Sequence, residues 1–307
     1  QIRSSAASDV YKRQAQARWC VAPVPKVAST VLKRLAVLAD GREPASATAF
    51  GETRPVLAIH RAEIHGLPCL ADLPQEQQEH WLGDAHALRL VVTRHPAERL
   101  LSFWHDKLHL AEPAYAPLNA SVQAARQRSV EETCRFTDFL SFLEENWDLL
   151  KTDGHLRPQC ESLGEAPRFE RLDRDEIVKK LPRLLQPLVP AATLGRIKDE
   201  LSIYDKQYRQ RLGKRWEDAY SKDGLQLVES LYGDDLKLYG YSMPRRRSDK
   251  VRPLAAVDAD ALVDPLQQLR ERHQQIAGLQ QQLAEAQQAL AKPCLLYTSD
   301  AADDRIC

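Results

Sequence analysis

The chain has 307 residues, and its 43 Lys and Arg residues are balanced by 43 Asp and Glu residues. A net charge of zero gives no reason to expect a polyanion-binding surface, so an acidic ligand would need a local basic patch. No apolar stretch is long enough to cross a membrane, and six cysteines without CxxC spacing favour a reduced compartment over a disulfide-bonded fold.

Both ends of the chain resemble translated sequencing adapter. Residues 4–14 match one strand of a transposon-type adapter, and residues 294–304 match its other strand in a shifted frame. Segments of this kind carry no information about a fold, so we expect 1–14 and 294–307 to contribute nothing to it. We therefore take 15–293 as part of a gene product whose natural termini are unknown.

The first predicted elements are a short buried strand and the helix that follows it. Residues 19–22 form an apolar strand pattern, and apolar residues from Val31 to Leu38 recur on one helical face. Between them runs the segment Pro25-Lys26-Val27-Ala28-Ser29-Thr30. A strand that leads directly into a helix presents backbone N–H groups and the positive end of the helix dipole, and Lys26 adds a cation. The sequence therefore predicts a phosphate site here, with a turn capped by Ser or Thr as the alternative.

A second strand and helix follow in the same order. Residues 88–93 show another buried-strand pattern, and Pro96 suits the first turn of a helix. Arg94 would then lie at the carboxyl end of the strand, where open α/β sheets bind ligands, and its planar guanidinium suits a phosphate. Ser102 lies two turns further on and would reach the same ligand if the helix packs along it. A surface arginine and a structural helix serine are the alternatives.

These two segments resemble the two cofactor motifs of sulfotransferases. More narrowly, they are similar to the family that includes the chondroitin, dermatan and HNK-1 carbohydrate sulfotransferases and their bacterial relatives. The loop 25–30 resembles the 5′-phosphosulfate loop of that family, and Arg94, Arg99 and Ser102 resemble its 3′-phosphate motif. The resemblance continues through residues 136–139, 155–159, 168–172 and 232–241.

The resemblance implies that a sulfuryl group moves from 3′-phosphoadenosine 5′-phosphosulfate (PAPS) to a carbohydrate hydroxyl, which leaves 3′-phosphoadenosine 5′-phosphate (PAP). Lys26 would stabilise the leaving group, and the amides of Ala28, Ser29 and Thr30 would cradle the 5′-phosphate. Arg94 and Ser102 would hold the 3′-phosphate. This scheme requires no metal, and the sequence shows no cluster of metal ligands at a suitable spacing.

Two residues are candidates for the base that takes the proton from the acceptor hydroxyl. His155 is the first, because an unperturbed imidazole titrates near neutral pH. Glu170 is the reserve candidate. The alternatives are that His155 makes a structural hydrogen bond in a loop and that Glu170 only anchors its segment to the backbone.

The fold class that the sequence predicts is α/β, a P-loop-like parallel sheet flanked by helices within residues 15–243. We expect 111–130 to be a loop over the substrate cleft, because it contains two prolines and many small residues. Residues 130–150 predict one or two helices, 174–181 a helix that ends at Pro182, and 220–238 another helix.

A second region follows this domain. Leucine and isoleucine recur at every seventh position, at Leu262, Leu269, Ile276, Leu283 and Leu290. This heptad predicts a C-terminal coiled-coil helix over 261–293, joined to the domain by a polar linker at 244–260. One sparse apolar seam makes few contacts, so any homo-oligomer formed through 262–290 would be weak.

Three other functions are open at this point. A P-loop kinase or NTPase would share the strand, loop and helix, but the loop lacks the glycines of GxxxxGK[ST]. A non-catalytic coiled-coil interaction protein would not need Arg94 and Ser102. A sulfotransferase for a small-molecule or lipid hydroxyl differs only in its acceptor loops. We expect no nucleic-acid partner. The expected compartment is the cytoplasm for a bacterial protein, or the Golgi lumen if a membrane anchor precedes residue 15.

Overall fold

The computed structural model describes most of the chain between residues 12 and 244. The described segments are 12–13, 19–44, 65–67, 69–129, 132–163, 169–205 and 216–244, with the single residues Ile59, Ile276, Leu283, Glu285 and Gln287. The predicted linker, most of the predicted coiled coil and the segment 294–307 lie outside the described residues. The described residues within 261–293 are each helical, and the side chain of Leu283 is exposed.

Three parallel strands form the centre of the fold, in the order β2 (Trp19–Ala22), β3 (Leu88–Thr93) and β4 (Glu170–Asp173). All of β2 and the last four residues of β3 are buried, which is why apolar runs predicted both strands. In β4 only Leu172 is buried, so its sequence carries little strand signal. The predicted parallel sheet flanked by helices is confirmed, and the sheet is small.

A fourth strand lies at the edge of this sheet. β1 (Lys12–Arg13) pairs antiparallel with β2, with Lys12 opposite Val21 and Arg13 opposite Cys20. The segment 1–14 is therefore not wholly outside the sheet, contrary to our expectation. The physical reason is that an edge strand offers a row of backbone donors and acceptors that any extended segment can pair with.

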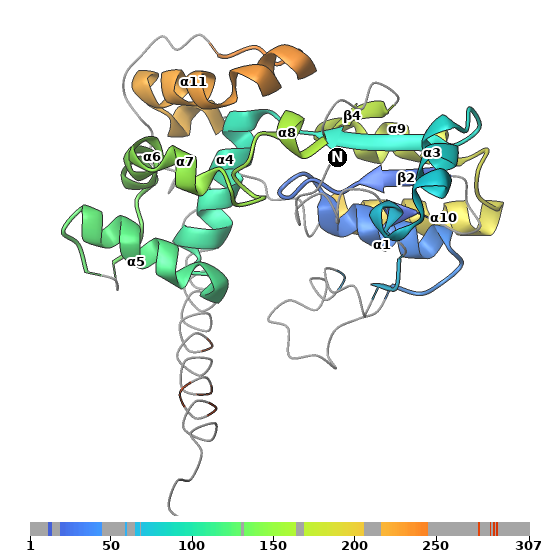
Figure 1. The fold of residues 1–307 in the computed structure, drawn as a ribbon, viewed down its shortest axis with the longest axis horizontal. Coiled ribbons are helices and arrows are strands. Elements are labelled where there is room, and N and C mark those ends of the chain that lie inside the picture. The colour runs from blue at the N-terminus through green and yellow to red at the C-terminus, as the bar shows by residue number, and fades with distance from the viewer. Residues whose placement is uncertain are drawn as a thin grey trace, which may run out of the picture.

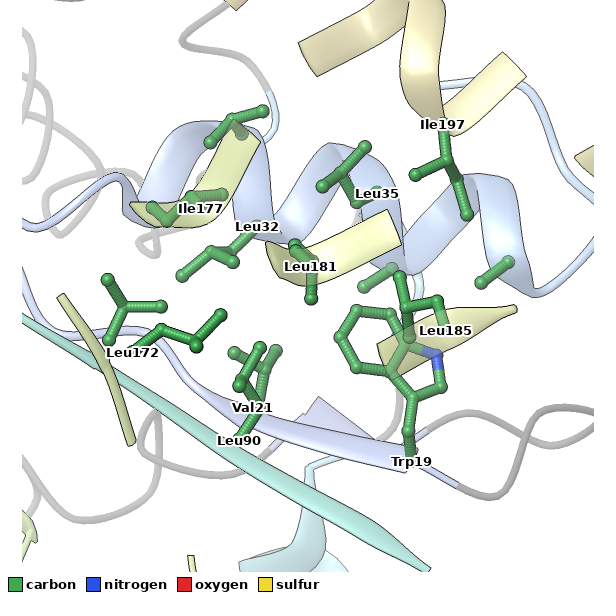
Figure 2. Packing of buried hydrophobic residues seen from close by; sticks show 14 of the residues in the cluster. Trp19, Val21, Leu32, Leu35, Leu90, Leu172, Ile177, Leu181, Leu185 and Ile197 are labelled. Atoms are coloured by element: carbon green, nitrogen blue, oxygen red, sulfur yellow. The ribbon is translucent and has the colours of Figure 1, made fainter. Parts of the chain in front are cut away.

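Helices α1 (Ser29–Ala39), α9 (Ile177–Leu185) and α10 (Ala191–Ile203) pack against one face of the sheet. Figure 2 shows the apolar cluster that they share with the strands, formed by Trp19, Val21, Leu32, Leu35, Leu90, Leu172, Ile177, Leu181, Leu185 and Ile197. Arg34 of α1 and Glu200 of α10 form an ion pair beside it. Helix α3 (Gln75–Gly83), which leads into β3, buries none of its residues.

The sequence predicts a helix that ends at Pro182, but α9 continues to Leu185. Ile177, Leu181 and Leu185 are fully buried on one face of this helix. Burial of such side chains stabilises by roughly 1.5–3 kcal/mol each. Together they outweigh the cost of an internal proline, which is about 3 kcal/mol.

The remaining helices form a separate group, reached from the sheet through α4 (Pro96–Trp104). Its other members are α5 (Ala116–Ala125), α6 (Phe136–Glu145), α7 (Trp147–Leu150) and α11 (Lys222–Tyr239). Figure 1 shows this group on one side of the molecule, with the sheet and α1, α9 and α10 on the other. Buried residues of α4, α6 and α11 form a second apolar cluster, including Phe103, Phe139 and Tyr232. The helices predicted for 130–150 and 220–238 are confirmed.

Within the stretch 111–130, residues 113–125 are helical instead of forming the predicted loop. It contains the 3-10 helix η6 (Pro113–Tyr115) and α5. Both prolines fall in the first turn of their helices, where a missing N–H is tolerated and the fixed φ of proline suits the chain. Pro113 and Pro117 therefore begin helices instead of marking a loop.

Short elements complete the described chain. They are the 3-10 helices η4 (Leu70–Asp72), η7 (Arg174–Glu176) and η9 (Trp216–Ala219), the π-helix η5 (His105–His109) and α8 (Gln159–Leu163). In the part of the chain that the structure describes, no helix combines the length and apolar character needed to cross a membrane.

Candidate functional site

The loop between β2 and α1 is strained at two positions. Lys26 has φ 64° and Ala28 has φ 57°, in the left-handed region that residues with side chains rarely adopt. A left-handed residue costs of order 1–2 kcal/mol, and such strain is typical of functional sites. Left-handed residues in a turn also aim successive backbone amides at one concave point, which is the geometry of an anion-binding loop.

Helix α1 begins directly after this loop. Ala28 is its N-cap residue, and no side chain caps the helix. The alternative of a turn capped by Ser29 or Thr30 is therefore wrong. The first amides of an α-helix have no carbonyl partner within the helix, and the positive end of the dipole lies there too. Both features favour an anionic ligand at this point.

Arg99 holds the loop in place. Its Nε donates to the carbonyl of Pro25 at 3.1 Å, its Nη2 to that of Gly154 at 3.1 Å and its Nη1 to that of Arg157 at 2.8 Å. The side chain is fully buried, and burial lowers the pKa of Arg99. These three bonds tie the Lys26 loop to the segment that carries His155.

Arg94 supports the same loop from the end of β3. Its Nη1 donates to the carbonyl of Lys26 at 3.1 Å, and its Nη2 donates at 3.0 Å to Glu98, which also accepts from Arg174 at 2.7 Å. Arg94 is only 3% exposed, and its Nε has no hydrogen-bond partner among the described residues. Burial lowers the pKa of Arg94, and Glu98 opposes this effect. Arg94 is thus not a surface arginine, and Ser102 is buried in α4 as well.

The ammonium group of Lys26 contacts the carboxylate of Asp106, and both side chains are 10% exposed. Asp106 lies in the π-helix η5, which continues α4, and π turns are frequent at functional sites. Burial lowers the pKa of Lys26 to about 8, although Asp106 acts to raise it. Lys107, the next residue of η5, donates to Glu112 at 2.5 Å. Two lysines and two carboxylates therefore lie close to the loop.

His155 lies close enough to these lysines to be influenced by them. Its Nδ1 is 3.1 Å from Oδ1 of Asp153 and 2.8 Å from the hydroxyl of Tyr115. Burial lowers the pKa of His155, with smaller lowering effects from Lys107 and Lys26, while Asp153 raises it. A pKa below the usual 6.5 leaves the ring neutral at pH 7, which is the form that a base requires.

Glu170 is not brought together with Lys26 and His155. It begins β4 and is exposed, and β3 separates its strand from β2. The carboxylates that act most strongly on Lys26 and His155 are Asp106, Glu112 and Asp153. The geometry therefore favours His155 over Glu170 as the candidate base.

The side chains of this site that were not predicted include Asp106, Lys107, Tyr115 and Asp153. Asp106 and Lys107 come directly after the second motif, on the helix that continues α4, but no local pattern predicts the contact between Asp106 and Lys26. Asp153 precedes His155 by two residues, a spacing at which a carboxylate can bond a histidine ring. Tyr115 carries no such signal, because the prolines and small residues of its segment predict a loop.

Metal ions in proteins are held by clustered His, Cys, Asp and Glu side chains. No three His, Cys, Asp or Glu side chains among the residues that the structure describes lie together as metal ligands would. No disulfide joins the cysteines at positions 20, 69, 134 and 160.

Residues 16–242 match the sequence model of the sulfotransferase family. The match includes the Lys26 loop, both buried arginines and the His155 segment. Comparisons with curated proteins and with solved structures gave no match. Because the family match spans more than half of the chain, the chain belongs to the sulfotransferase family.

Proposed function

We propose that the protein transfers the sulfuryl group of PAPS to a hydroxyl of a carbohydrate and releases PAP. The observation that carries this proposal is the arrangement around Lys26. A strained loop at the start of α1 lies beside a buried ammonium group, and His155 lies within electrostatic reach of that group. This arrangement combines an anion site, a cation for a leaving group and a base.

The residues present fit a donor with two phosphate groups. The amides at the start of α1, with Pro25 to Thr30 as the loop, would hold the 5′-phosphosulfate. Arg94 offers a buried Nε that has no partner among the described residues, as expected of a donor reserved for a ligand. Arg94 and Ser102 would hold the 3′-phosphate, which distinguishes PAPS from ordinary adenylates.

His155 and Lys26 would act on opposite sides of the sulfur atom, His155 on the acceptor and Lys26 on the leaving group. PAPS supplies the sulfuryl group when it is bound. Nε2 of His155 takes the proton of the acceptor hydroxyl as the acceptor oxygen forms its bond to sulfur. The bond between sulfur and the 5′-phosphate oxygen breaks with its electron pair, and Lys26 balances the charge that develops on this oxygen.

The carbohydrate acceptor is supported by the narrower resemblance to carbohydrate sulfotransferases. A small-molecule or lipid hydroxyl would use the same donor site and the same base. A screen of desulfated glycans beside phenols and lipid alcohols distinguishes these acceptors. We expect product from a glycan, and product from phenols or lipids alone would replace the carbohydrate part of the proposal.

Donor recognition is tested by thermal-shift titration with PAP, AMP and ATP. We expect PAP to raise the melting temperature more than AMP does, because only PAP carries the 3′-phosphate that Arg94 and Ser102 would hold. Equal shifts with PAP and AMP would contradict the 3′-phosphate site. A large shift with ATP and magnesium alone would point to a nucleotide-binding protein of another kind.

A further inference from the structure

The histidine proposed as the base is one member of a closed group of three side chains. Asp153 lies two residues before it, and Tyr115 comes from η6, which precedes α5. Tyr115 packs edge-on against Phe103 of α4, with ring centroids 5.3 Å apart. The aspartate and the tyrosine are thus held by different parts of the fold and meet at the histidine ring.

We propose that Asp153 and Tyr115 are positioning residues that hold His155 in the Nδ1–H tautomer, so that Nε2 is the proton acceptor. This inference rests on the proposed function, because it assigns the base of that reaction to one atom. The tautomer of the His155 ring is measurable without any substrate.

The donors and acceptors around the ring favour this tautomer. Nδ1 of His155 is 3.1 Å from Oδ1 of Asp153, and the hydroxyl of Tyr115 is 3.0 Å from Oδ2. A carboxylate only accepts hydrogen bonds, so both neighbours must donate to it. Nδ1 therefore carries the proton, and the tyrosine donates its own proton to Oδ2. The Tyr115 oxygen, 2.8 Å from Nδ1, is then a second acceptor for Nδ1–H.

The opposite tautomer leaves the group unsatisfied. With the proton on Nε2, the lone pair of Nδ1 would face the carboxylate oxygen at 3.1 Å. The single hydroxyl proton of Tyr115 could then satisfy only one of its two neighbours. The backbone N–H of His155 also donates to Oδ1 of Asp153 at 2.7 Å, which fixes the carboxylate relative to the ring.

The remaining ring nitrogen is available for chemistry. Nε2 of His155 makes no hydrogen bond within the described part of the chain, and the side chain is 31% exposed. When Nε2 takes the proton of the acceptor hydroxyl, the ring becomes an imidazolium with both nitrogens protonated. The adjacent carboxylate of Asp153 stabilises that cation. Burial acts to raise the pKa of Asp153, but hydrogen bonds from His155 and Tyr115 outweigh this effect and lower the pKa to about 2, so the carboxylate stays charged.

The charged groups around the ring make this role testable by pH. Asp153 faces it from its own segment, Tyr115 from η6, Lys107 from η5 and Lys26 from the loop after β2. The two lysines lower the pKa of His155, and the carboxylate raises it. Removing the carboxylate charge therefore has one expected sign, a further fall in the pKa of His155.

The experiment compares Asp153→Asn with the unaltered protein by NMR titration of the His155 ring. The ring signals are assigned with His155→Gln. The control is Asp148→Asn, the same change at an aspartate whose side chain is 92% exposed. We expect Asp153→Asn to lower the pKa of His155 and to shift the ring towards the Nε2–H tautomer, and Asp148→Asn to change neither.

A kinetic arm follows the same variants. We expect Asp153→Asn to lower kcat by less than the roughly 10²–10⁴-fold that a general base contributes, and to move the acid limb of the pH profile to lower pH. Tyr115→Phe keeps the Asp153 charge but removes the hydroxyl that donates to Oδ2, so we expect a smaller shift towards the Nε2–H tautomer and a smaller loss of activity than in Asp153→Asn.

Three results separate the possibilities. An unchanged pKa and tautomer of His155 in Asp153→Asn would overturn the positioning role, whatever the enzyme does. A changed tautomer with a kcat equal to that of the unaltered protein would overturn it as well. Failure of the unaltered protein to bind PAP would instead overturn the proposed function, and the NMR result would still decide whether Asp153 holds the ring.

Discussion

In the proposed reaction, Lys26 must carry its proton and His155 must lack one, because Lys26 would act as a cation and His155 as a base. Burial lowers the pKa of both side chains. The lowered pKa of His155 keeps its ring neutral at pH 7. The pKa of Lys26 is lowered to about 8, so Lys26 loses its charge near pH 8. The two residues are therefore in their active forms together only within a narrow range of pH.

The first prediction is a bell-shaped pH profile of kcat/KM, which reports the groups of the free enzyme. We expect the acid limb to lie below pH 6.5, the ordinary value for histidine, and the alkaline limb near pH 8. Initial rates at low acceptor concentration measure both limbs. Lys26→Arg is the matched variant, because a guanidinium stays charged and should remove the alkaline limb. An unchanged alkaline limb in this variant would show that another group titrates there.

Arg99 gives a prediction about stability. Arg99→Leu would leave the carbonyls of Pro25, Gly154 and Arg157 without their donor. Unpaired groups of this kind cost about 1–3 kcal/mol each, so we expect a loss of about 3 kcal/mol or more in the free energy of unfolding. Urea denaturation measures this loss. Arg157→Leu is the control, because the side chain of Arg157 makes one exposed bond, to the carbonyl of Thr152. Equal losses in the two variants would contradict the role given to Arg99.

Some of these residues could be predicted from the sequence, and others could not. Lys26, Arg94 and His155 lie in segments with a local pattern, so their neighbours along the chain identify them. Asp106 contacts Lys26 across 80 positions, and no local pattern reports such a contact. Arg94 was predicted as a phosphate ligand, but its contact with the carbonyl of Lys26 became visible only in the fold.

At the scale of elements, helix α4 depends on a histidine at its start. His95 is its N-cap residue, and Nδ1 accepts the N–H of Ala97 at 3.2 Å. Nε2 lies 3.4 Å from the carbonyl of Ser242. A ring that accepts at Nδ1 and donates at Nε2 is neutral, and burial lowers the pKa of His95. As the pH falls, the unfolded chain therefore takes up a proton before the folded one does.

This cap predicts how stability depends on pH. Its contribution is fully present above pH 6.5, the unfolded value, and is lost as the pH falls through the lower folded pKa. His95→Asn keeps a good cap without a titrating ring, so we expect it to lose less stability than the unaltered protein between about pH 7.5 and about pH 5. His86→Asn, at an exposed histidine, is the control. Parallel pH dependence in His95→Asn and the unaltered protein would contradict the prediction.

The elements that could be predicted are those with strong apolar patterns. β2, β3, α1 and α4 have buried runs or a proline at the first turn, and each forms where the sequence predicts it. β4 is different, because three of its four residues are polar and its pairing with β3 is what defines it. Helix α5 was missed because its proline begins the helix instead of breaking it.

At the scale of the whole molecule, α4 joins two apolar cores. Figure 1 shows α4 between the sheet and the other helices of the helical group. Helix α4 leaves the carboxyl end of β3, packs Phe103 and Leu101 into the helical cluster and continues into η5. The loop after β2 meets η5 through Lys26 and Asp106. The site therefore lies where the sheet and the helical group come together, and both must fold for it to form. The sequence predicted the two kinds of element but not this junction, which depends on long-range contacts.

We propose that this site moves a sulfuryl group from PAPS, with Lys26 stabilising the leaving group. The most direct measurement is transfer of ³⁵S from labelled PAPS to a panel of desulfated glycans, with PAP affinity measured on the same preparations. We predict labelled product with the unaltered protein, and for Lys26→Met a loss of kcat much larger than its loss of PAP affinity, because the charge on the leaving oxygen develops in the transition state. Labelled product formed equally well by Lys26→Met, or none from any acceptor by an unaltered protein that binds PAP, would contradict the claim.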